Sequence, residues 1–411
     1  MVKQEYIDQL VGIQGYRVVA LHFGEGRKSG DKELVVEIGR MEARYRCRCG
    51  AEFDTYHDGG QRMIRDLPYG PYKRSWLCFR QVRVDCPDCG VVTEELPFSD
   101  PRAGYTKRLA ADVAPSCRET RSLKAMAEQY GLDWKTVKEI DERALERELP
   151  HPQDTPAKIL AVDEFSLKKR HKYGTTVIDA EAPCVLWVGK DRKQDTLEEF
   201  FSLFGEENCA GVLSCAMDMW DPYEAAVRKW CPQAEIVCDP FHIISSYGRE
   251  VVDRVRATET KEAREKYKGV YKGTRYILLS NSENLKDWQQ ERLSELLAIN
   301  KRLFTAYLLK DDLKRLRQYR SPYWAERFFR GWYRRAICSK IEPLKKFARM
   351  LKRRLPGILA HCRYPIHTSV LEGIDNEIEV IKRVAYGYRD EEYFFLKIRG
   401  AFRPPTYTSG R

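Results

Sequence analysis

The chain has 411 residues, of which 43% are hydrophobic and 32% are charged, and its formal net charge is +11. This balance is ordinary for a globular protein of two or three domains and excludes an intrinsically disordered chain. The chain has no run of 18 apolar residues and no apolar signal-peptide core near its start, so we expect a cytoplasmic protein without a membrane partner.

The thirteen cysteines predict metal binding better than disulfide bonding. Their number is odd and most of them are scattered singly along the chain. In a reducing cytoplasm such thiols are expected to be either buried or bound to a metal.

Two short cysteine motifs near the N-terminus predict a zinc ribbon. The first is CxC at residues 47–49, the second is CxxC at residues 86–89, and residues 76–84 between them alternate as a β-strand does. Four thiolates complete a tetrahedral shell around a structural Zn²⁺ ion. The expected ligands are Cys47, Cys49, Cys86 and Cys89. Because CxC makes a tighter loop than CxxC, His57 or Cys78 could replace one ligand, and four cysteines without a metal are the alternative.

Residues 121–148 are expected to form two helices joined by a tight turn, the pattern of a helix-turn-helix motif. Gly131 supplies the turn, and Asp133 is placed to cap the second helix. The first exposed positions of that helix, Lys135 and Thr136, would face DNA. A helical hairpin with another role gives the same pattern, but a position between a zinc ribbon and a nuclease-like core favours DNA binding.

From Lys158 onward, three strands follow one another and then helices alternate with two further strands. The expected strands are 158–163, 173–179, 183–189, 211–217 and 235–238, and the expected helices are about 195–204, about 222–231 and from about 241. This order is that of a ribonuclease H-like fold, in which the first and fourth strands lie side by side at the centre of the sheet.

Two aspartates follow the apolar residues of these central strands. A carboxylate at the end of a buried strand lies at the rim of a sheet, where it can bind Mg²⁺. The predicted strand order brings Asp163 and Asp218 together although 55 positions separate them. Each aspartate alone is explained better as a helix cap or a turn residue. Glu164, Asp221 and Asp239 are acidic neighbours that compete for the same role.

A later helix offers a third acid, Glu372. An apolar face of this helix is expected to pack on the sheet and consists of Val370, Ile374, Ile378 and Ile381. Glu372 and Asn376 lie on another face and could point toward the strand ends. Three such acids can hold two metal ions, as in nucleases and polymerases. Glu377 and Glu379 are alternatives, and so is a glutamate-rich helix that is merely solvated.

A basic segment lies between the second and third acids. Residues 301–363 contain 19 Lys or Arg and four Asp or Glu, an excess of 15 positive charges, and ten aromatic residues are interleaved with them. Basic side chains suit phosphates and flat rings suit splayed bases, so the segment favours contact with nucleic acid. A helical domain with a solvated basic face is the alternative. Because 154 positions separate Asp218 from Glu372, the segment is expected to be a helical insertion into the core.

Four motifs carry a resemblance to a known family. They are Val162-Asp163-Glu164-Phe165-Ser166, Met217-Asp218-Met219 with Tyr223, Asp239-Pro240-Phe241-His242, and Glu372-Gly373-Ile374-Asp375-Asn376 followed by residues 381–389. With these motifs, the zinc ribbon and the helix-turn-helix, nearly the whole chain resembles the bacterial insertion-sequence transposases of the ISL-three type. Three features depart from the family pattern: the first zinc knuckle is shortened, Pro240 stands where Arg is expected, and Asp375 stands where a second Asn is common.

The resemblance implies a DDE transposase whose catalytic, Mg²⁺-binding (or Mn²⁺-binding) acids are Asp163, Asp218 and Glu372. One ion, held mainly by Asp163 and Asp218, would activate the water that cuts a strand at the transposon end. A second ion, held by Asp163 and Glu372, would stabilise the leaving 3′ oxygen, and the freed 3′-hydroxyl would then attack target DNA. The further residues expected at this site are Asp239, His242 and Asn376 as supports, and Lys382, Arg383 and Arg389 as contacts to DNA phosphates.

The expected fold class is α/β, with a ribonuclease H-like catalytic core that contains a large helical insertion. The expected domains are a β-rich zinc ribbon (1–100), a helix-turn-helix domain (101–152), the catalytic domain (153–245 with 366–400), the insertion (246–365) and a tail (401–411). Such a protein would bind the terminal inverted repeats of an insertion sequence and catalyse Mg²⁺-dependent strand cleavage and strand transfer.

Its expected partners are double-stranded DNA, as transposon ends and target, and at least one further copy of the chain, in a cytoplasmic complex associated with the nucleoid. Two alternatives remain: a DNA-binding regulator with an inactive nuclease-like domain, and a ribonuclease H-like nuclease that does not join strands.

Overall fold

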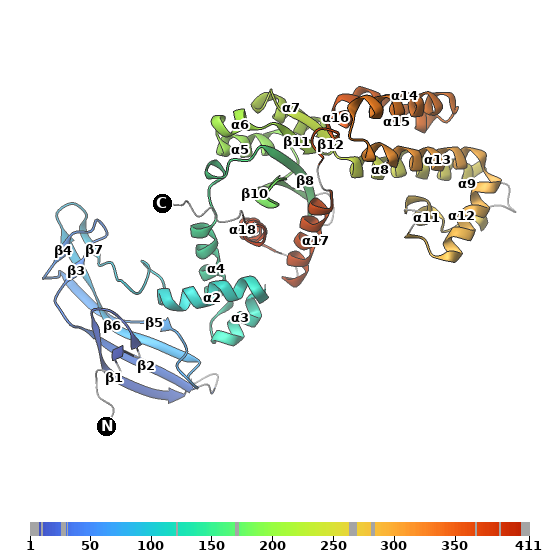
Figure 1. The fold of residues 1–411 in the computed structure, drawn as a ribbon. Helices are drawn as coiled ribbons and strands as arrows, with labels where there is room; N and C mark the ends of the chain where they lie inside the picture. The colour runs from blue at the N-terminus through green and yellow to red at the C-terminus, as the bar shows by residue number, and fades with distance from the viewer. Residues whose placement is uncertain are drawn as a thin grey trace. The chain divides into compact units, whose positions relative to one another are not determined.

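The computed structural model describes residues 8–9, 11–25, 30, 32–120, 122–168, 172–262, 269–280, 284–365, 368–385 and 388–403. The chain divides into two units, which are Met1–Leu149 with Ile381–Gly400 and Pro150–Val380 with Ala401–Arg411 (Figure 1). Residues 366–400, grouped in one domain from the sequence, are divided at Ile381 inside helix α17 (Thr368–Val384). Most of the expected tail, residues 404–411, lies outside the described residues.

The first unit begins with a five-stranded sheet. Its strands are β1 (Tyr16–Glu25), β2 (Lys32–Arg40), β5 (Asp58–Asp66), β6 (Arg74–Cys86) and β7 (Gly90–Thr93), in the order β1-β2-β6-β5 with β7 also beside β6. Alternate residues of β2, namely Leu34, Val36 and Ile38, are buried because successive side chains of a strand point to opposite faces. They pack with residues such as Ile64 and Leu77 in the core of this sheet.

A short hairpin and three helices complete the N-terminal part of this unit. The hairpin strands are β3 (Tyr45–Arg46) and β4 (Glu52–Phe53), and the helices are α2 (Lys107–Thr120), α3 (Leu123–Tyr130) and α4 (Trp134–Glu148). The predicted helix-turn-helix geometry is confirmed in detail: Gly131 has a φ of 59°, which glycine adopts without steric strain. The Asp133 side chain accepts a hydrogen bond from the backbone N–H of Lys135 at 2.8 Å and so caps α4.

Helix α18 (Glu391–Ala401) packs against α4 in the first unit. The Asp141 carboxylate of α4 is fully buried and accepts hydrogen bonds from Lys397 Nζ at 2.8 Å and from Tyr393 Oη at 2.5 Å. Lys138 Nζ donates to Asp390 at 2.6 Å. Because a buried charge is stable only when it is paired and hydrogen-bonded, these contacts hold the late segment of the chain to the helix-turn-helix.

The second unit is built on a sheet in the order β10-β9-β8-β11-β12. Its strands are β8 (Ile159–Lys168), β9 (Lys172–Asp179), β10 (Cys184–Lys190), β11 (Ser214–Met217) and β12 (Glu235–Cys238). The first and fourth of these strands, β8 and β11, pair in parallel, as the sequence predicts. Strand β8 does not end at Asp163 as expected: it continues to Lys168 because Asp163 and the residues after it keep pairing with β9.

Three helices connect and cover the strands of this sheet, preceded by a 3-10 turn at Pro152–Asp154. They are α5 (Gln194–Phe204), α6 (Glu206–Gly211) and α7 (Asp221–Trp230). Phe200 and Phe204 of α5 and Val227 of α7 are fully buried and pack in one cluster with Leu160 and Val162 of β8. This packing fixes the strand that carries Asp163.

Residues 240–360 are mostly helical and have a hydrophobic core of their own. The helices are α8 (Pro240–Tyr247), a π-helical segment (Gly248–Asp253), α9 (Arg254–Glu262), α11 (Arg275–Leu279), α12 (Asp287–Ile299), α13 (Lys301–Lys314), a 3-10 turn (Arg315–Gln318), α14 (Pro322–Cys338), α15 (Glu342–Arg353) and α16 (Leu355–Ala360). Helix α16 packs closely on β12, since a β-carbon on Gly357 would lie 2.9 Å from Cys238 Sγ. In the described ranges, no helix is long and apolar enough to cross a membrane.

Candidate active site and zinc site

Asp163 and Asp218 lie where the two central strands of the second unit part. The last residues that pair between β8 and β11 are Val162 and Met217, and the two aspartates follow them directly. Because the strands run in parallel, both carboxylates emerge at the same edge of the sheet. The Asp163 side chain is buried, at 8% exposure, whereas Asp218 reaches the surface at 27%.

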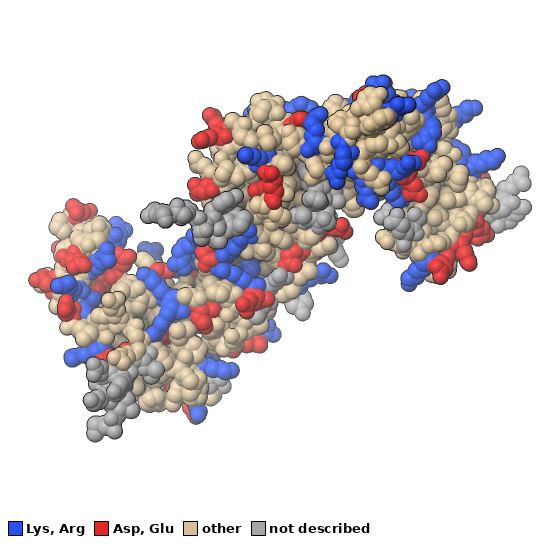
Figure 2. All heavy atoms as spheres, viewed as in Figure 1, with Lys and Arg blue, Asp and Glu red and all other residues tan. Residues whose placement is uncertain are grey.

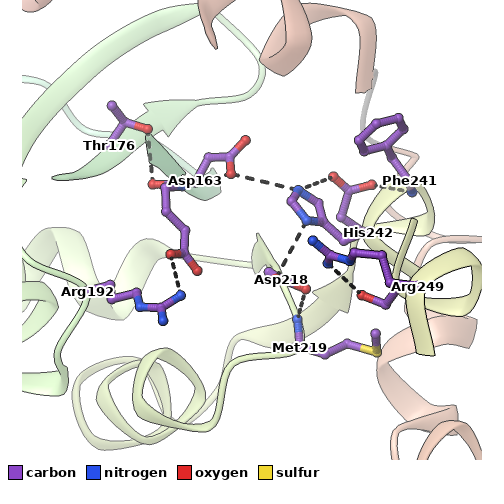
Figure 3. Close-up of polar contacts among 11 residues, drawn as sticks. Asp163, Thr176, Arg192, Asp218, Met219, Phe241, His242 and Arg249 are labelled. Carbon is purple, nitrogen blue, oxygen red and sulfur yellow. Dashed lines mark hydrogen bonds and ion pairs between the residues drawn. The ribbon is translucent and has the colours of Figure 1, made fainter. Parts of the chain in front are cut away.

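His242 of α8 lies between these carboxylates (Figure 3). Its Nε2 atom is 3.8 Å from Asp163 Oδ1 and 3.7 Å from Asp239 Oδ2, and its Nδ1 atom is 3.6 Å from Asp218 Oδ2. Asp239 also accepts a hydrogen bond from the backbone N–H of Phe241 at 2.8 Å, which fixes the start of α8. One imidazole ring therefore contacts three acids that come from three different parts of the chain.

The electrostatics of this cluster favour a bound cation. Burial raises the pKa of Asp163 and the pKa of Asp239, while the nearby His242 acts on both in the opposite direction. Buried carboxylates with raised pKa values lack compensating positive charge. Carboxylate oxygens are also the ligands that Mg²⁺ and Mn²⁺ prefer, so the donor set fits such an ion.

Helix α17 adds an acid to the cluster, and it is Asp375. The side chains of Asp375 and Asp163 share a hydrogen bond, and burial together with the Asp163 charge raises the pKa of Asp375 to about 8. Glu372, one turn earlier, is exposed, and within the described ranges no hydrogen bond or ion pair joins it to Asp163 or Asp218. Asn376 is exposed as well.

The spacing of the acids on this helix already indicated Asp375, although the motif alone pointed to Glu372. A spacing of three places Asp375 on the same side of the helix as Glu372. The expected apolar face of α17 is confirmed at Ile374, Ile378 and Ile381, which are all buried, while the side chain of Val370 lies outside the described residues.

Two of the competing acids are held by arginines. Arg192 (Figure 3) donates a hydrogen bond to Glu164 at 3.0 Å. Arg192 also packs over the Tyr173 and Trp220 rings at 4.3 and 4.7 Å. Asp221 pairs with Arg354. Both carboxylates are therefore already compensated, which leaves Asp163, Asp218 and Asp239 around His242 and Asp375 beside Asp163.

The four N-terminal cysteines come together in the first unit. Cys47 and Cys49 lie in the β3–β4 hairpin, Cys86 ends β6, and Cys89 precedes β7. Their sulfur atoms all lie within 4.8 Å of one another, close to the separation of about 3.8 Å that four Zn–S bonds of about 2.3 Å require. In the described part of the chain, no other group of three or more possible ligands is this close.

The two alternative zinc ligands, Cys78 and His57, lie outside the cluster of four sulfurs. Cys78 is buried within the long strand β6, and His57 Nδ1 lies 3.3 Å from Asp58. The short CxC loop also favours a thiolate, because the backbone N–H of Ala51 lowers the pKa of Cys49 to about 7. The residues present therefore fit a tetrahedral zinc ion.

The residues expected to contact DNA lie in the first unit, on helices α4 and α17 and in the segment between α17 and α18. Lys135 is exposed and Thr136 is half-buried in the first turn of α4. In the C-terminal segment of this unit, Lys382 is half-buried, and Arg383 and Arg389 are exposed. Residues 386 and 387 of the last family motif lie outside the described residues.

The basic segment of the sequence forms helices α13 to α16 in the second unit. Lys and Arg side chains gather over the end of this unit that holds α14, α15 and α16 (Figure 2). Four of the ten aromatic residues were misjudged as partners for bases: Tyr307, Phe329, Trp332 and Phe347 are buried and form part of the helical core. Tyr323 and Trp324, which are 65% and 52% exposed, remain accessible.

Comparison with known proteins adds evidence independent of this geometry. Residues 160–398 match the family model of the ISL3 DDE transposases, described as "Transposase", and residues 94–145 match the helix-turn-helix domain of transposase family ISL3. The chain is 39% identical to the transposase for insertion sequence element IS1001 of Bordetella parapertussis, over 98% of this chain and 99% of that protein. It is 28% identical to the transposase for insertion sequence element IS1557 of Mycobacterium tuberculosis strain H37Rv, over 93% of this chain and 92% of that protein.

Proposed function

Because the chain belongs to transposase family ISL3, we propose that it binds the terminal inverted repeats of an insertion sequence and cuts and joins DNA strands there with divalent metal ions. The observation that carries the proposal is the meeting of Asp163 and Asp218 at one edge of the sheet, around His242. The strand order, with three antiparallel strands followed by two parallel ones, supports a ribonuclease H-like core that contains residues 246–365 as an insertion.

The proposed metal ligands are Asp163, Asp218 and Glu372. Bound Mg²⁺ or Mn²⁺ would activate the attacking oxygen and stabilise the leaving one. The chain contributes orientation: the backbone N–H of Glu164 donates to Asp163 at 2.8 Å, and that of Met219 donates to Asp218 at 2.6 Å. Carboxylates that are held in place before the substrate arrives need little reorganisation during the reaction.

We assign Asp375 a positioning role beside Glu372. Asp375 contacts Asp163 directly, which suits a residue that orients the central ligand. Glu372 is exposed and one turn away, and its longer side chain is free to bind an ion that arrives with DNA. Asp239 and His242 support the cluster from α8, and Asn376 lies one turn after Glu372 on α17.

The first unit would supply DNA recognition. Lys135 and Thr136 at the start of α4 are the proposed contacts to the terminal repeats, as in other helix-turn-helix proteins. Lys382, Arg383 and Arg389 are the proposed contacts to phosphates near the cut. A structural Zn²⁺ would hold the cysteine ribbon, and a cytoplasmic complex of at least two chains would pair two transposon ends.

The test is strand cleavage and joining on a labelled duplex that carries the element's own end. The wild-type chain is expected to cut and join this duplex with Mg²⁺ and to lose both activities in EDTA. Asp163→Asn is expected to lose cleavage by at least about a thousandfold, a loss typical of removing a central electrostatic group, and to retain the gel shift of the end. Glu207→Gln, which changes an exposed acid of α6, is the matched control and is expected to behave as wild type.

Each other outcome has a definite meaning. Binding without cleavage by the wild-type chain would favour a DNA-binding regulator, and cleavage without joining would favour a simple nuclease. Wild-type cleavage by Asp163→Asn would contradict the proposed metal site.

A further inference from the structure

A groove begins at Asp218 and extends along helix α15. Its first part encloses about 550 Å³, and its lining includes Asp218 and Met219 from the sheet and Lys346, Phe347, Met350 and Arg353 from α15. A second, shallower hollow of about 560 Å³ is lined by Tyr333, Lys346, Arg349, Lys352 and Arg353. Lys346 and Arg353 line both parts, so the two hollows adjoin along one side of α15.

Three of the acids that line this groove are already compensated by arginines, and two of its cations have no acidic partner among the described residues. Arg354 pairs with Asp221 and lies 3.1 Å from Glu224, and Arg254 pairs with Glu250. Lys346 and Arg353 are exposed, and among the described residues neither forms an ion pair with an acid. The α15 side of the groove therefore offers free positive charge close to a proposed catalytic carboxylate.

The floor of the same groove is apolar. Met219 directly follows Asp218 and is half-buried, and Phe347 and Met350 meet it from α15. Thioether and aromatic side chains make favourable contacts with flat rings. A groove of this volume falls in the range of pockets that enclose small organic ligands. A phosphate beside a flat heterocyclic base, which is the chemistry of a nucleotide, matches this combination of cationic wall and apolar floor.

We propose that the α15 groove binds a short unpaired stretch of the DNA strand next to the scissile phosphate. Phosphates of this stretch lie along Lys346 and Arg353, and its bases contact Met219 and Met350. The inference rests on the proposed function, because it takes Asp218 as a catalytic acid. A base that is paired and stacked in a duplex cannot place its face against the side chains that line a groove, so the strands separate locally when the end is bound, at a cost that the groove contacts offset.

The first test reports strand separation without cleavage. A transposon-end duplex carries 2-aminopurine, whose fluorescence rises on unstacking, at the nucleotide next to the scissile phosphate. Full-length Asp163→Asn with Mg²⁺ is expected to raise the fluorescence several-fold when it binds. Adding Arg353→Ala or Lys346→Ala is expected to abolish most of this rise. Lys345→Ala is the matched control, because Lys345 lies on the same helix, pairs with Glu342 at 2.7 Å and lines neither hollow.

The second test separates strand separation from simple contact with a duplex. Arg353→Ala is expected to slow cleavage of a fully paired end by about tenfold, the equivalent of about 1.4 kcal/mol. Two mismatched base pairs next to the scissile phosphate remove most of the cost of separation and are expected to restore most of the lost rate. A phosphate contact to paired DNA would leave the defect unchanged on the mismatched substrate.

The outcomes distinguish this inference from the proposed function. If the wild-type chain cuts the end but 2-aminopurine stays dark and mismatches give no rescue, the inference is wrong and the transposase chemistry stands. If the wild-type chain cuts no transposon end, the proposed function fails and the inference fails with it. Far-UV circular dichroism and an unchanged gel shift confirm that each variant is folded, as expected for exposed residues.

Discussion

His242 contacts carboxylates that are far apart in sequence, so it contributes to the site even before any ion binds. Its ring nitrogens lie 3.6 to 3.8 Å from Asp163, Asp218 and Asp239. Carboxylates that lie close together repel one another, and the imidazole ring between them keeps them apart. A bound ion would lie next to this ring, so His242 limits the space that is open to the metal.

The assignment of the third acid can be tested residue by residue. Glu372→Gln is expected to abolish Mg²⁺-dependent cleavage, because the amide is a weak ligand for a hard cation. Asp375→Asn is expected to lower the cleavage rate by about tenfold only, because an amide can still hydrogen-bond to Asp163. Asp375→Ala removes this bond and is expected to be slower than Asp375→Asn.

A larger loss of cleavage in Asp375→Asn than in Glu372→Gln would exchange the roles proposed for these two acids. If Asp375→Asn is inactive and Glu372→Gln cuts at the wild-type rate, then Asp375 is the third ligand. Gel-shift binding by both variants serves as the control for folding.

Lys310 gives a prediction about stability and pH. This residue is 1% exposed, and its Nζ donates to the carbonyl oxygens of Leu278, Leu279 and Ser280 at 2.8 to 3.2 Å. Lys310→Met leaves these carbonyls without their donor and is expected to cost about 1–3 kcal/mol of unfolding free energy.

Burial also lowers the pKa of Lys310 to about 8. Between this value and the ordinary lysine value, the unfolded chain holds a proton that the folded chain has released, so the Lys310 contribution to stability increases as the pH rises through this window. Denaturant melts of both proteins at pH 7.5 and pH 9.5 measure it. A constant difference between wild type and Lys310→Met at the two pH values would contradict the shift.

A site residue can be predicted from the sequence when a local pattern determines its position. It cannot be predicted when its position depends on packing between distant parts of the chain. Asp163 and Asp218 follow apolar strand residues, and the strand order is enough to bring them together. Asp375 was not predicted, because only the packing of α17, far along the chain, decides which acid on that helix contacts Asp163. Glu372 and Asp375 are three positions apart, and a pattern of helical spacing cannot separate them.

At the scale of elements, boundaries follow the partners of a strand or helix. Gly131 and Asp133 allowed the turn and the cap of α4 to be predicted, because both signals are local. The length of β8 was underestimated, because the strand continues through pairing with β9 after β11 has ended. The aromatic residues of α14 and α15 were expected to form a binding surface, but Phe329, Trp332 and Phe347 are buried because these helices pack on their neighbours.

The cysteine ribbon gives a prediction at this scale. The wild-type chain is expected to hold roughly one zinc ion per molecule, since four sulfurs converge within 4.8 Å. The double variant Cys86→Ser and Cys89→Ser is expected to hold none, as measured by atomic absorption. Cys338→Ser, which changes an exposed cysteine outside the cluster, is the control. Equal zinc in all three proteins would contradict the ribbon.

At the scale of the whole molecule, the polar contacts of α18 tie the end of the chain to the helix-turn-helix. Lys397→Met leaves the Asp141 carboxylate buried with only the Tyr393 hydroxyl as partner. Breaking one side of a buried ion pair typically costs about 3–5 kcal/mol, so this variant is expected to destabilise the first unit.

Hydrogen exchange measures where the loss occurs. Amides of α4 and α18 are expected to lose protection in Lys397→Met, while those of the sheet β8 to β12 keep it. Lys124→Met, at an exposed position of α3 whose contact with Glu128 is 4.0 Å, is the control. Equal loss of protection throughout the chain would show that the two units unfold together.

Helix α17 and the segment after it also set an order of events in synthesis. The unit that contains the helix-turn-helix is built from two separate segments, Met1–Leu149 and Ile381–Gly400. The second segment is synthesised only after the sheet of the other unit and its helices. A nascent chain therefore lacks α18, and with it the partners of Asp141, until residues 150–390 have been synthesised. Each molecule therefore forms the buried contacts of its helix-turn-helix unit only after the sheet and the helical segment have been made.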